Sequence, residues 1–348
     1  MTGRSHVAAI GTYSAATSTG VHTVAVDPDT GALTQLDSVV AGPNPTFVAS
    51  HPHDEYVYAA VRTEPEGLIK AFQVDNDTGE LSLVSSIESG ALSPCHCSVD
   101  ATGEYLFVAH YEGGSVSMLP LGSDGTVAAP TAVVEHSGDS IDPDRQTSPH
   151  PHSANPGPAN DYLYVPDLGT DQVIVYEIRP AEDDITVHRT VDVAPGSGPR
   201  HLSFGPDGEY GYLINELDST VTVFERAPDG DLSEQSKIST LPADFEGENK
   251  TAEVEVHPSG RYVFASNRGR DTIVTFAVAG DELRHIGEIP TGGAWPRHFS
   301  VSPTGEFLFV ENRDTNGIVV FDIDIETGEL TRIDERLAVT EPVCLQWV

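Results

Sequence analysis

Lysine is nearly absent from this chain. Only Lys70, Lys237 and Lys250 occur among 348 residues, and lysine and arginine together number 18 against 54 aspartates and glutamates, which gives a formal charge of −36. A protein that binds the phosphate backbone of nucleic acids needs the opposite sign, so we expect no nucleic acid partner. In molar salt the Debye length shrinks to about 3 Å and screens such a charge, which predicts a halophilic source with a salty cytoplasm.

Cysteine and long apolar runs are also scarce. The three cysteines are an odd number and provide no disulfide framework, which is typical of a reducing compartment. No apolar segment approaches the roughly 20 residues that span a bilayer. The segment from Met1 to Gly20 lacks the long apolar core of a secretory signal. We therefore expect no membrane association and a cytoplasmic location.

Several motifs that carry catalysis or bind metals are missing. The chain has no Gly-x-Ser-x-Gly elbow, no His-Glu-x-x-His and no glycine-rich phosphate loop. In Cys95-His96-Cys97 the alternation of side chains along a strand directs His96 away from the two cysteines. We therefore expect no metal and no other cofactor.

A repeated pattern is present instead. Six times along the chain a turn is followed by an aromatic residue that begins a short β-rich run. These aromatic residues are Tyr56, Tyr105, Tyr162, Tyr210, Tyr262 and Phe307. One strand precedes each run and two follow it, so every repeat contains four strands, as the blade of a β-propeller does.

The two ends of the chain determine the number of blades. The segment His6–Thr12 matches the second strand of a repeat, and Pro342–Val348 matches the first strand. Together they complete a seventh blade and leave no open sheet edge. The sequence thus predicts an all-β, seven-bladed β-propeller with four antiparallel strands per blade, one blade being closed by the N- and C-terminal strands, as a single domain over residues 1–348.

This architecture brings particular side chains to one mouth of the central channel. The first strand of each blade starts where the antiparallel second strand ends, so residues at these positions converge. The candidates at this mouth are His150, His152, Arg200, His201, Asn215, Glu216, Arg268, Arg297, His298 and Arg313. Because cations are so rare in this chain, the four arginines predict a cationic pocket for an anionic small molecule. We expect the long segment from His136 to Pro149 to overhang it.

The motifs at this mouth resemble those of a known family. Arg145–Ser153 (RQTSPHPHS), Gly198–Leu202 (GPRHL), Asn215-Glu216 and Ser266–Gly269 (SNRG) are similar to segments of the seven-bladed propeller lactonases. This family includes bacterial-type 6-phosphogluconolactonases and fungal 3-carboxy-cis,cis-muconate lactonizing enzymes, and the resemblance covers all seven repeats. The sixth repeat departs from the pattern, since Lys250–Glu253 (KTAE) replaces the usual Gly-Pro-Arg/His-His opening.

The resemblance implies a catalytic site and a reaction. It places catalysis at His152, Arg200, Glu216 and Arg268, with His150 as the alternative to His152. The implied reaction is hydrolysis of a sugar-acid lactone, foremost 6-phospho-D-glucono-1,5-lactone, by a carboxylic-ester hydrolase without a cofactor. Substrate-binding candidates are His150, His201, Arg297, His298, Asn215 and Arg313.

Lactone hydrolysis requires an activated water, a stabilised oxyanion and a grip on the substrate's anionic group. We expect Glu216 or His152 to take the proton from water and Arg200 to stabilise the oxyanion. Arg268, helped by Arg297, would hold phosphate or carboxylate.

Two other functions remain open on the sequence alone. A muconate-type lactonizing isomerase would use the same arginines to bind carboxylates. A non-catalytic propeller that binds a metabolite or a protein would carry polar residues at its strand starts for structural reasons alone. Against such a scaffold, the only tryptophans are Trp295 and Trp347, so the repeats lack a WD-type signature. We expect the protein to act as a monomer.

Overall fold

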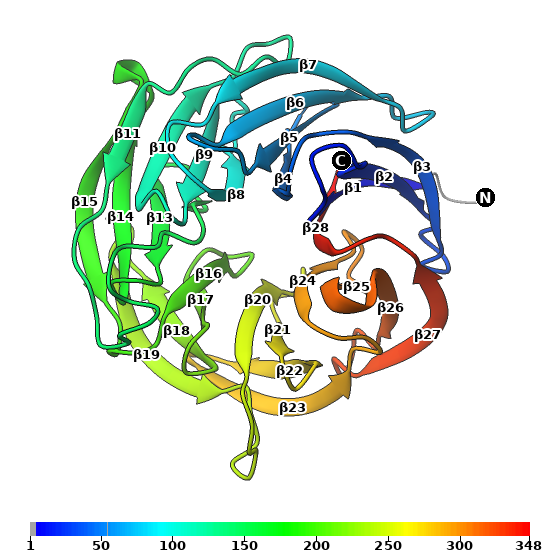
Figure 1. Cartoon of the computed structure of the whole chain (residues 1–348). Coiled ribbons are helices and arrows are strands. Elements are labelled where there is room, and N and C mark those ends of the chain that lie inside the picture. Colours follow the sequence, from blue (N-terminus) through cyan, green and yellow to red (C-terminus); the bar gives the residue numbers. More distant parts are fainter. Residues whose placement is uncertain (1–4, 54) are drawn as a thin grey trace.

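The computed structural model describes residues 5–53 and 55–348, and its strands form seven four-stranded antiparallel sheets. The sheets stand around a central axis as the blades of a propeller (Figure 1). Among the described residues the only helices are two short 3-10 turns, η1 Pro180–Glu182 and η2 Arg313–Thr315. The predicted seven-bladed, four-stranded propeller is therefore confirmed.

Each of the first four blades has one strand at the channel and three that follow outward from it. From the innermost strand outward, blade 1 consists of β28 (Pro342–Trp347), β1 (His6–Thr12), β2 (Val21–Val26) and β3 (Leu33–Val39). Blade 2 consists of β4 (Pro45–Ser50), β5 (Tyr56–Val61), β6 (Leu68–Val74) and β7 (Leu81–Glu88). Blade 3 consists of β8 (Pro94–Val99), β9 (Tyr105–His110), β10 (Ser115–Pro120) and β11 (Ala132–Glu135). Blade 4 consists of β12 (Asn155–Pro156), β13 (Tyr162–Asp167), β14 (Gln172–Arg179) and β15 (Asp184–Asp192).

The last three blades follow the same order. Blade 5 consists of β16 (Pro199–Phe204), β17 (Tyr210–Asn215), β18 (Thr220–Arg226) and β19 (Leu232–Ser239). Blade 6 consists of β20 (Lys250–Val256), β21 (Tyr262–Arg268), β22 (Thr272–Ala279) and β23 (Glu282–Pro290). Blade 7 consists of β24 (Pro296–Val301), β25 (Phe307–Asn312), β26 (Gly317–Ile323) and β27 (Leu330–Leu337).

Blade 1 is the seam of the ring. Its innermost strand β28 comes from the C-terminal end of the chain and pairs antiparallel with β1, from Ala8 opposite Trp347 to Thr12 opposite Pro342 (Figure 1). This confirms that the two ends of the chain close one blade. The pairing leaves no unpaired inner edge at which the ring could open.

The six repeated aromatic residues each begin the second strand of a blade, as predicted. They also join neighbouring blades. Gly230, in the β18–β19 turn of blade 5, has a φ of 82°, and a Cβ there would lie 2.7 Å from Cδ2 of Tyr162 in blade 4. Only glycine combines this backbone conformation with so close an approach. The turn of one blade thus packs on the aromatic ring of the preceding blade.

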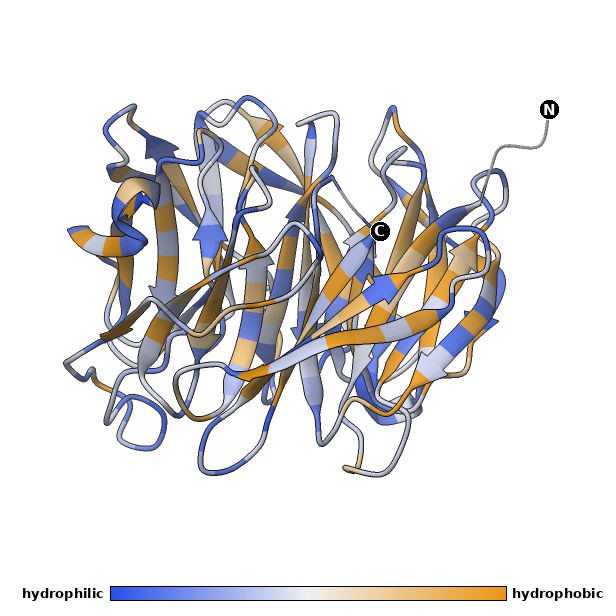
Figure 2. Ribbon diagram, turned by 90° about the horizontal axis from the view of Figure 1, so that it is seen from above, coloured by the Kyte–Doolittle hydropathy of each residue, from blue (hydrophilic) through white to orange (hydrophobic). Residues whose placement is uncertain are grey.

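The apolar core lies between the blades. Tyr164 of blade 4 and Phe224 of blade 5 are fully buried in one cluster, and Phe264 of blade 6 and Phe299 of blade 7 are fully buried in another. Figure 2 shows hydrophobic residues concentrated along the strands and hydrophilic residues in many of the loops. Each sheet packs against a neighbouring sheet on both faces, which buries its apolar side chains. The innermost strands line the channel, and their polar side chains face it.

Candidate active site

Strand register fixes which residues share a level of the channel. Pro199, which begins β16, pairs with Asn215 at the end of β17. In blade 4 an isolated bridge pairs Pro151 with Asp167 at the end of β13 in the same way. His152, which follows Pro151, therefore occupies the position in blade 4 that Arg200, which follows Pro199, occupies in blade 5. The register places His152, and not His150, at the level of the arginine.

The same register defines three rings of residues around the channel, one from each blade. The mouth ring follows the paired end of the second strand and consists of Tyr13, Arg62, Tyr111, Leu168, Glu216, Arg268 and Arg313. The middle ring follows the paired start of the inner strand and consists of Thr46, Cys95, His152, Arg200, Ala252, Arg297 and Val343. The deep ring is one residue further on and consists of Phe47, His96, Ser153, His201, Glu253, His298 and Cys344.

Glu216 is the only carboxylate of the mouth ring, and three arginines surround it. Its Oε1 accepts a hydrogen bond from Arg145 Nη2 at 2.8 Å, and its Oε2 lies 2.9 Å from Arg268 Nη2 and 3.4 Å from Arg200 Nε. Burial alone would raise the pKa of Glu216, but the guanidinium groups of Arg268, Arg200 and Arg145 hold that pKa well below its usual range. Glu216 is therefore a fixed anion within a cationic cluster.

Strand β20 holds two of these arginines in place. Arg200 Nη1 donates to the carbonyl of Ala252, and Arg268 donates to the carbonyls of Lys250 and Thr251. Ala252 occupies the middle-ring position at which blades 5 and 7 carry Arg200 and Arg297, so the small side chain leaves room for the guanidinium groups. The departure of blade 6 from the repeat is thus part of the site.

Both anchored arginines remain cations at neutral pH. Burial lowers the pKa of Arg200 to about 9, with Arg297 and Arg268 adding to the effect. Burial likewise lowers the pKa of Arg268, while Glu216 opposes the shift. Arg200, Glu216 and Arg268 form one buried cluster, as the sequence predicts for these three catalytic candidates.

Arg145 is a member of the cluster that is missing from the candidates chosen on sequence. It belongs to the segment between β11 and β12, and its Nη2 also donates to the hydroxyl of Tyr111 at 3.1 Å. The expected overhang of residues 136–149 thus delivers a guanidinium group to Glu216. The one sequence feature that could have indicated Arg145 as a site residue is its place at the start of the RQTSPHPHS motif.

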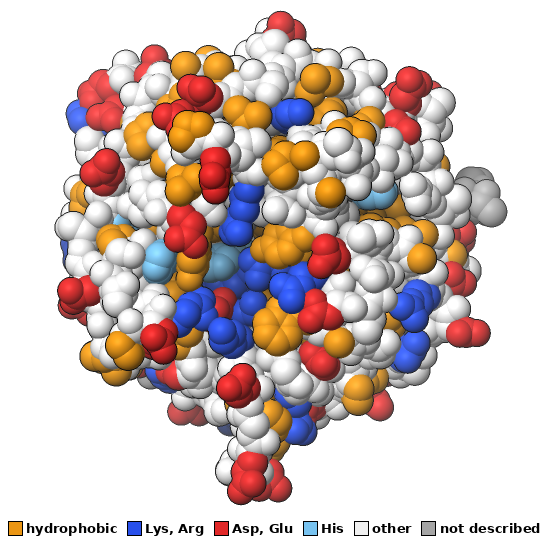
Figure 3. All heavy atoms as spheres, in the orientation of Figure 1, with side chains coloured by type: hydrophobic (Ala, Val, Ile, Leu, Met, Phe, Trp, Pro, Cys, Tyr) orange, Lys and Arg blue, Asp and Glu red, His pale blue; other side chains and the backbone are white. Residues whose placement is uncertain are grey.

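The remaining arginines of the mouth lie against aromatic rings. Arg297 and Arg62 lie 5.2 and 5.9 Å from the ring centre of Tyr13, and Arg313 lies 5.2 Å from that of Trp295. Arg313 also pairs with Asp314 at 2.6 Å. In the part of the chain that the structure describes, no carboxylate forms an ion pair with Arg62 or Arg297. Figure 3 shows Lys and Arg side chains gathered at the centre of this face.

The two histidines of the Pro-His-Pro-His run have different surroundings. His150 is half-buried, stacks on Tyr111 at 4.3 Å and places its Nδ1 2.8 Å from the Tyr111 carbonyl. His152 is buried, and its Nδ1 has no hydrogen-bond partner among the described residues. Burial, together with Arg200 and His201, places the pKa of His152 well below its usual value. His152 is therefore a neutral imidazole beside the arginines.

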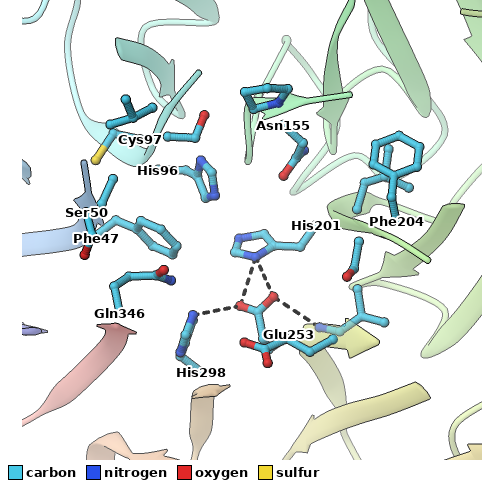
Figure 4. A pocket seen from close by; sticks show the side chains of 18 of the residues that line it. Phe47, Ser50, His96, Cys97, Asn155, His201, Phe204, Glu253, His298 and Gln346 are labelled. Atoms are coloured by element: carbon cyan, nitrogen blue, oxygen red, sulfur yellow. Dashed lines mark hydrogen bonds and ion pairs between the residues drawn. The ribbon is translucent and has the colours of Figure 1, made fainter. Parts of the chain in front are cut away.

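His201 and His298 lie below the arginine cluster, in the deep ring. His201 Nδ1 lies 3.0 Å from Glu253 Oε1, and His298 Nε2 lies 3.5 Å from Glu253 Oε2 (Figure 4). These three side chains line a cavity of about 560 Å³ that continues past Ser50, Ser203 and Gln346, further along the inner strands and away from the mouth. The cavity reaches neither Arg200 nor Glu216, so the channel has two separate polar compartments.

Asn215 does not belong to either compartment. It is fully buried, and its amide nitrogen donates to the hydroxyls of Thr220 and Thr222 in its own blade. Asn267 makes the corresponding contact with Thr272 in blade 6. We therefore assign Asn215 a structural part in the repeat and remove it from the substrate-binding candidates.

The described residues show neither a cluster of metal ligands nor a membrane-spanning helix. Within residues 5–53 and 55–348, no group of three or more His, Cys, Asp or Glu side chains is arranged to hold a metal ion. Among the same residues, no helix combines the length and the apolar character that crossing a membrane requires.

The chain is similar to known proteins along nearly its whole length. A family model described as "Lactonase, 7-bladed beta-propeller" matches residues 7–347. The 6-phosphogluconolactonase of Bacillus subtilis is 32% identical over 346 residues, which cover 99% of this chain and 98% of that protein. The 6-phosphogluconolactonase of Serratia proteamaculans is 34% identical over 312 residues and 88% of each chain. The structure of a periplasmic gluconolactonase from Pseudomonas aeruginosa matches with a TM-score of 0.92 and 31% identity over 99% of both chains.

Proposed function

The chain belongs to the seven-bladed β-propeller lactonases, which are carboxylic-ester hydrolases, and from this premise we propose that it hydrolyses 6-phospho-D-glucono-1,5-lactone to 6-phosphogluconate. The observation that carries the choice of substrate is the pair of arginines without an ion-pair partner among the described residues, Arg297 and Arg62, beside the Glu216 cluster. Guanidinium groups bind phosphate through paired hydrogen bonds. A protein of net charge −36 has little other reason to gather cations at one mouth.

His152 is the general base in this proposal. Nδ1 of His152 is buried without a hydrogen-bond partner among the described residues and can accept a proton from water, whereas both oxygens of Glu216 are held by three arginines. A lactone is an activated ester and needs a weaker base than an amide does. Glu216 then acts by positioning Arg145, Arg200 and Arg268.

Arg200 stabilises the oxyanion that forms when water attacks the lactone carbonyl. Its guanidinium group is fixed by the Ala252 carbonyl and by Glu216, so it does not have to reorganise as charge develops. Arg268 makes more contacts, because it donates to two backbone carbonyls as well as pairing with Glu216. We therefore assign the substrate's phosphate chiefly to Arg297 and Arg62, with Arg268 in support.

The direct test follows lactone loss with purified protein in molar KCl, since the acidity predicts adaptation to high salt. We expect 6-phosphogluconolactone to disappear faster than its spontaneous rate, with and without EDTA. Turnover of tricarboxylic muconates alone would favour the isomerase, and no turnover of either compound would favour a binding propeller. The unphosphorylated glucono-1,5-lactone serves as the matched control for the phosphate.

The choice between the two bases has its own test. His152→Asn is expected to abolish most turnover, whereas Glu216→Gln is expected to keep the base and a larger part of the turnover, with a loss only through displaced arginines; the reverse order would make Glu216 the base. If both variants keep wild-type turnover, the catalytic assignment is wrong. The cytoplasmic location and the monomeric state stay predictions, to be measured by fractionation and by light scattering.

A further inference from the structure

The deep ring contains one carboxylate at a position where other blades carry a histidine. Glu253 of blade 6 has the register position of His201 in blade 5 and His298 in blade 7. It is buried, and its two oxygens contact both of these imidazoles. A carboxylate and an imidazole in contact form a pair between which a proton moves readily.

The His201 ring also lies next to the ring of His152, at the catalytic level. Its Nε2 is buried without a hydrogen-bond partner among the described residues, and the same is true of Nδ1 of His152. The centres of the two rings are 5.4 Å apart. In the tautomer in which Nδ1–H of His201 donates to Glu253, Nε2 of that ring is a proton acceptor.

Lactone hydrolysis at neutral pH leaves a proton to be removed. Water adds its oxygen to the carbonyl carbon and the ring C–O bond breaks. One proton of the water ends on the released ring oxygen, which becomes a hydroxyl. The other is lost when the carboxylic acid product ionises, so each turnover yields one carboxylate, one hydroxyl and one free proton.

The two compartments offer this proton unequal exits. At the mouth, Arg62 and Arg297 have no ion-pair partner among the described residues, and the field of such cations opposes an outgoing proton. On the other side, the cavity is lined by Glu253 and Glu255 and by no lysine or arginine of the described chain. It reaches the opposite surface of the propeller, since its rim includes the exposed Pro158.

We propose that His152 returns the proton it takes from water to the ring oxygen, then takes the proton of the carboxylic acid product and passes it through His201 to Glu253, from which it leaves by the cavity at the opposite face of the propeller. Substrate and proton then use different ends of one channel. Glu253 and His201 act on the reaction through His152 and do not touch the substrate. The proposal rests on the proposed lactonase function.

The surroundings of Glu253 suit a residue that takes up and releases a proton. Burial raises its pKa from the ordinary glutamate value, while His298, Arg200 and Arg297 oppose the rise. Beyond His298, Glu311 is the next titratable group, at 2.9 Å from His298 Nδ1. The His201 ring also faces His96, with ring centres 5.2 Å apart. These groups are within reach of the route but are not steps of it.

The test is Glu253→Gln, which keeps the shape and hydrogen-bonding capacity of the side chain but cannot carry the proton. We expect kcat for the phosphorylated lactone to fall about tenfold, with KM within a factor of two. The solvent deuterium isotope effect on kcat should increase. Added imidazole, which is small enough for the cavity, should restore at least half of the lost rate, after subtraction of imidazole-catalysed hydrolysis without enzyme.

Three further variants separate proton transfer from structure. Glu253→Asp keeps a carboxylate and should retain most activity. Glu209→Gln makes the same exchange at an exposed residue of the turn between β16 and β17, outside the lining of the cavity, and should leave kcat unchanged. His201→Gln should reproduce the loss and the rescue by imidazole, which keeps the proposal testable if Glu253→Gln does not fold.

Two failures are distinguishable. If the wild-type protein hydrolyses no lactone, the proposed function itself fails, and this route with it. If the wild-type protein is active but Glu253→Gln keeps its kcat, only the route is overturned. A loss of kcat that imidazole does not relieve, with an unchanged isotope effect, would likewise overturn the route and assign Glu253 to structure.

Discussion

The mouth and the deep ring are neighbouring levels of the channel, yet the pKa values of their buried carboxylates are shifted in opposite directions. At the mouth, Glu216 has a pKa far below its ordinary value, because arginines overcome the effect of burial. In the deep ring and beside it, burial dominates and raises the pKa values of Glu253 and Glu311. Burial is common to all three, so the nearest cations decide in which direction the pKa of each carboxylate shifts.

The comparison also separates net charge from local charge. The chain as a whole carries −36, but the three groups in contact with Glu216 are arginines. A substrate approaching the molecule meets an acidic surface and then a cationic mouth. We infer that salt aids substrate entry by screening the surface more strongly than the buried cluster.

The largest expected effect comes from removing the anion at the mouth. Glu216→Gln leaves three neighbouring guanidinium groups without their shared carboxylate, and breaking a buried ion pair in this way costs about 3–5 kcal/mol of unfolding free energy. The folded-state pKa of Glu216 is depressed, so its contribution is present above about pH 4.3 and is lost only as the pH falls below that value. The loss should therefore be the same at pH 5 and pH 8 in denaturant titrations.

The control for this variant is Glu288→Gln. Glu288 pairs with Arg270 at 2.5 Å on the outermost strand of blade 6, where solvent reaches both groups. Such a pair contributes less than about 1 kcal/mol. Equal losses in the two variants would mean that the mouth cluster is no stronger than a surface pair.

The next largest effect concerns catalysis. Arg200→Ala removes the guanidinium group assigned to the oxyanion, and loss of one such donor lowers kcat by about 10²–10³. The control is Lys237→Ala, which removes a cation that pairs with Asp218 on the periphery of blade 5. Its kcat should stay within a factor of two of the wild-type value. Retention of more than a tenth of the wild-type kcat by Arg200→Ala would exclude the assigned role.

Much of this arrangement could be predicted from sequence because the repeats impose it. The aromatic residues marked the second strand of six blades, and the antiparallel order of the strands placed the start of each first strand beside the end of the second. Arg200 and Glu216 follow from these two regularities, since one begins a first strand and the other ends a second strand. Periodicity thus located both the fold and the centre of the site.

The rest depended on features that do not repeat. Arg145 reaches Glu216 from an irregular segment whose course has no counterpart in the other blades. Arg200 and His201 are neighbours in sequence but belong to different compartments, which only the strand register separates. The role of Glu253 could be inferred only after the structure showed its contacts with His201 and His298. A carboxylate that breaks the repeat pattern does not by itself indicate which residues it contacts.

A smaller effect should identify the part of the mouth that binds the anion. Arg297→Ala is expected to raise KM for 6-phosphogluconolactone about tenfold, which corresponds to about 1.4 kcal/mol of binding free energy. KM for glucono-1,5-lactone, which has no phosphate, should change less than twofold. Steady-state kinetics on both lactones decide the matter, and an equal rise for both would assign Arg297 to the general shape of the pocket.

The smallest expected effect is a change of stability with pH, and it tests the raised pKa of Glu311, deeper in the channel than Glu216. Glu311 is fully buried on β25, with Oε2 2.9 Å from Nδ1 of His298. Its pKa is raised by burial and by nearby Glu253. Between the unfolded value near about 4.3 and the raised folded value, the folded protein keeps a proton that the unfolded chain has lost. The free energy of unfolding must therefore fall as the pH rises through this window.

Glu311→Gln removes that dependence, because the amide is neutral at every pH. The variant should gain stability relative to the wild type between pH 5 and pH 8, by on the order of 1 kcal/mol, since each unit of raised pKa is worth about 1.4 kcal/mol. Denaturant titrations at the two pH values measure this difference, and exposed Glu329→Gln is the control that should show none. A constant difference between Glu311→Gln and wild type would mean that Glu311 ionises as freely as Glu216 does, and the contrast between the two levels of the channel would disappear.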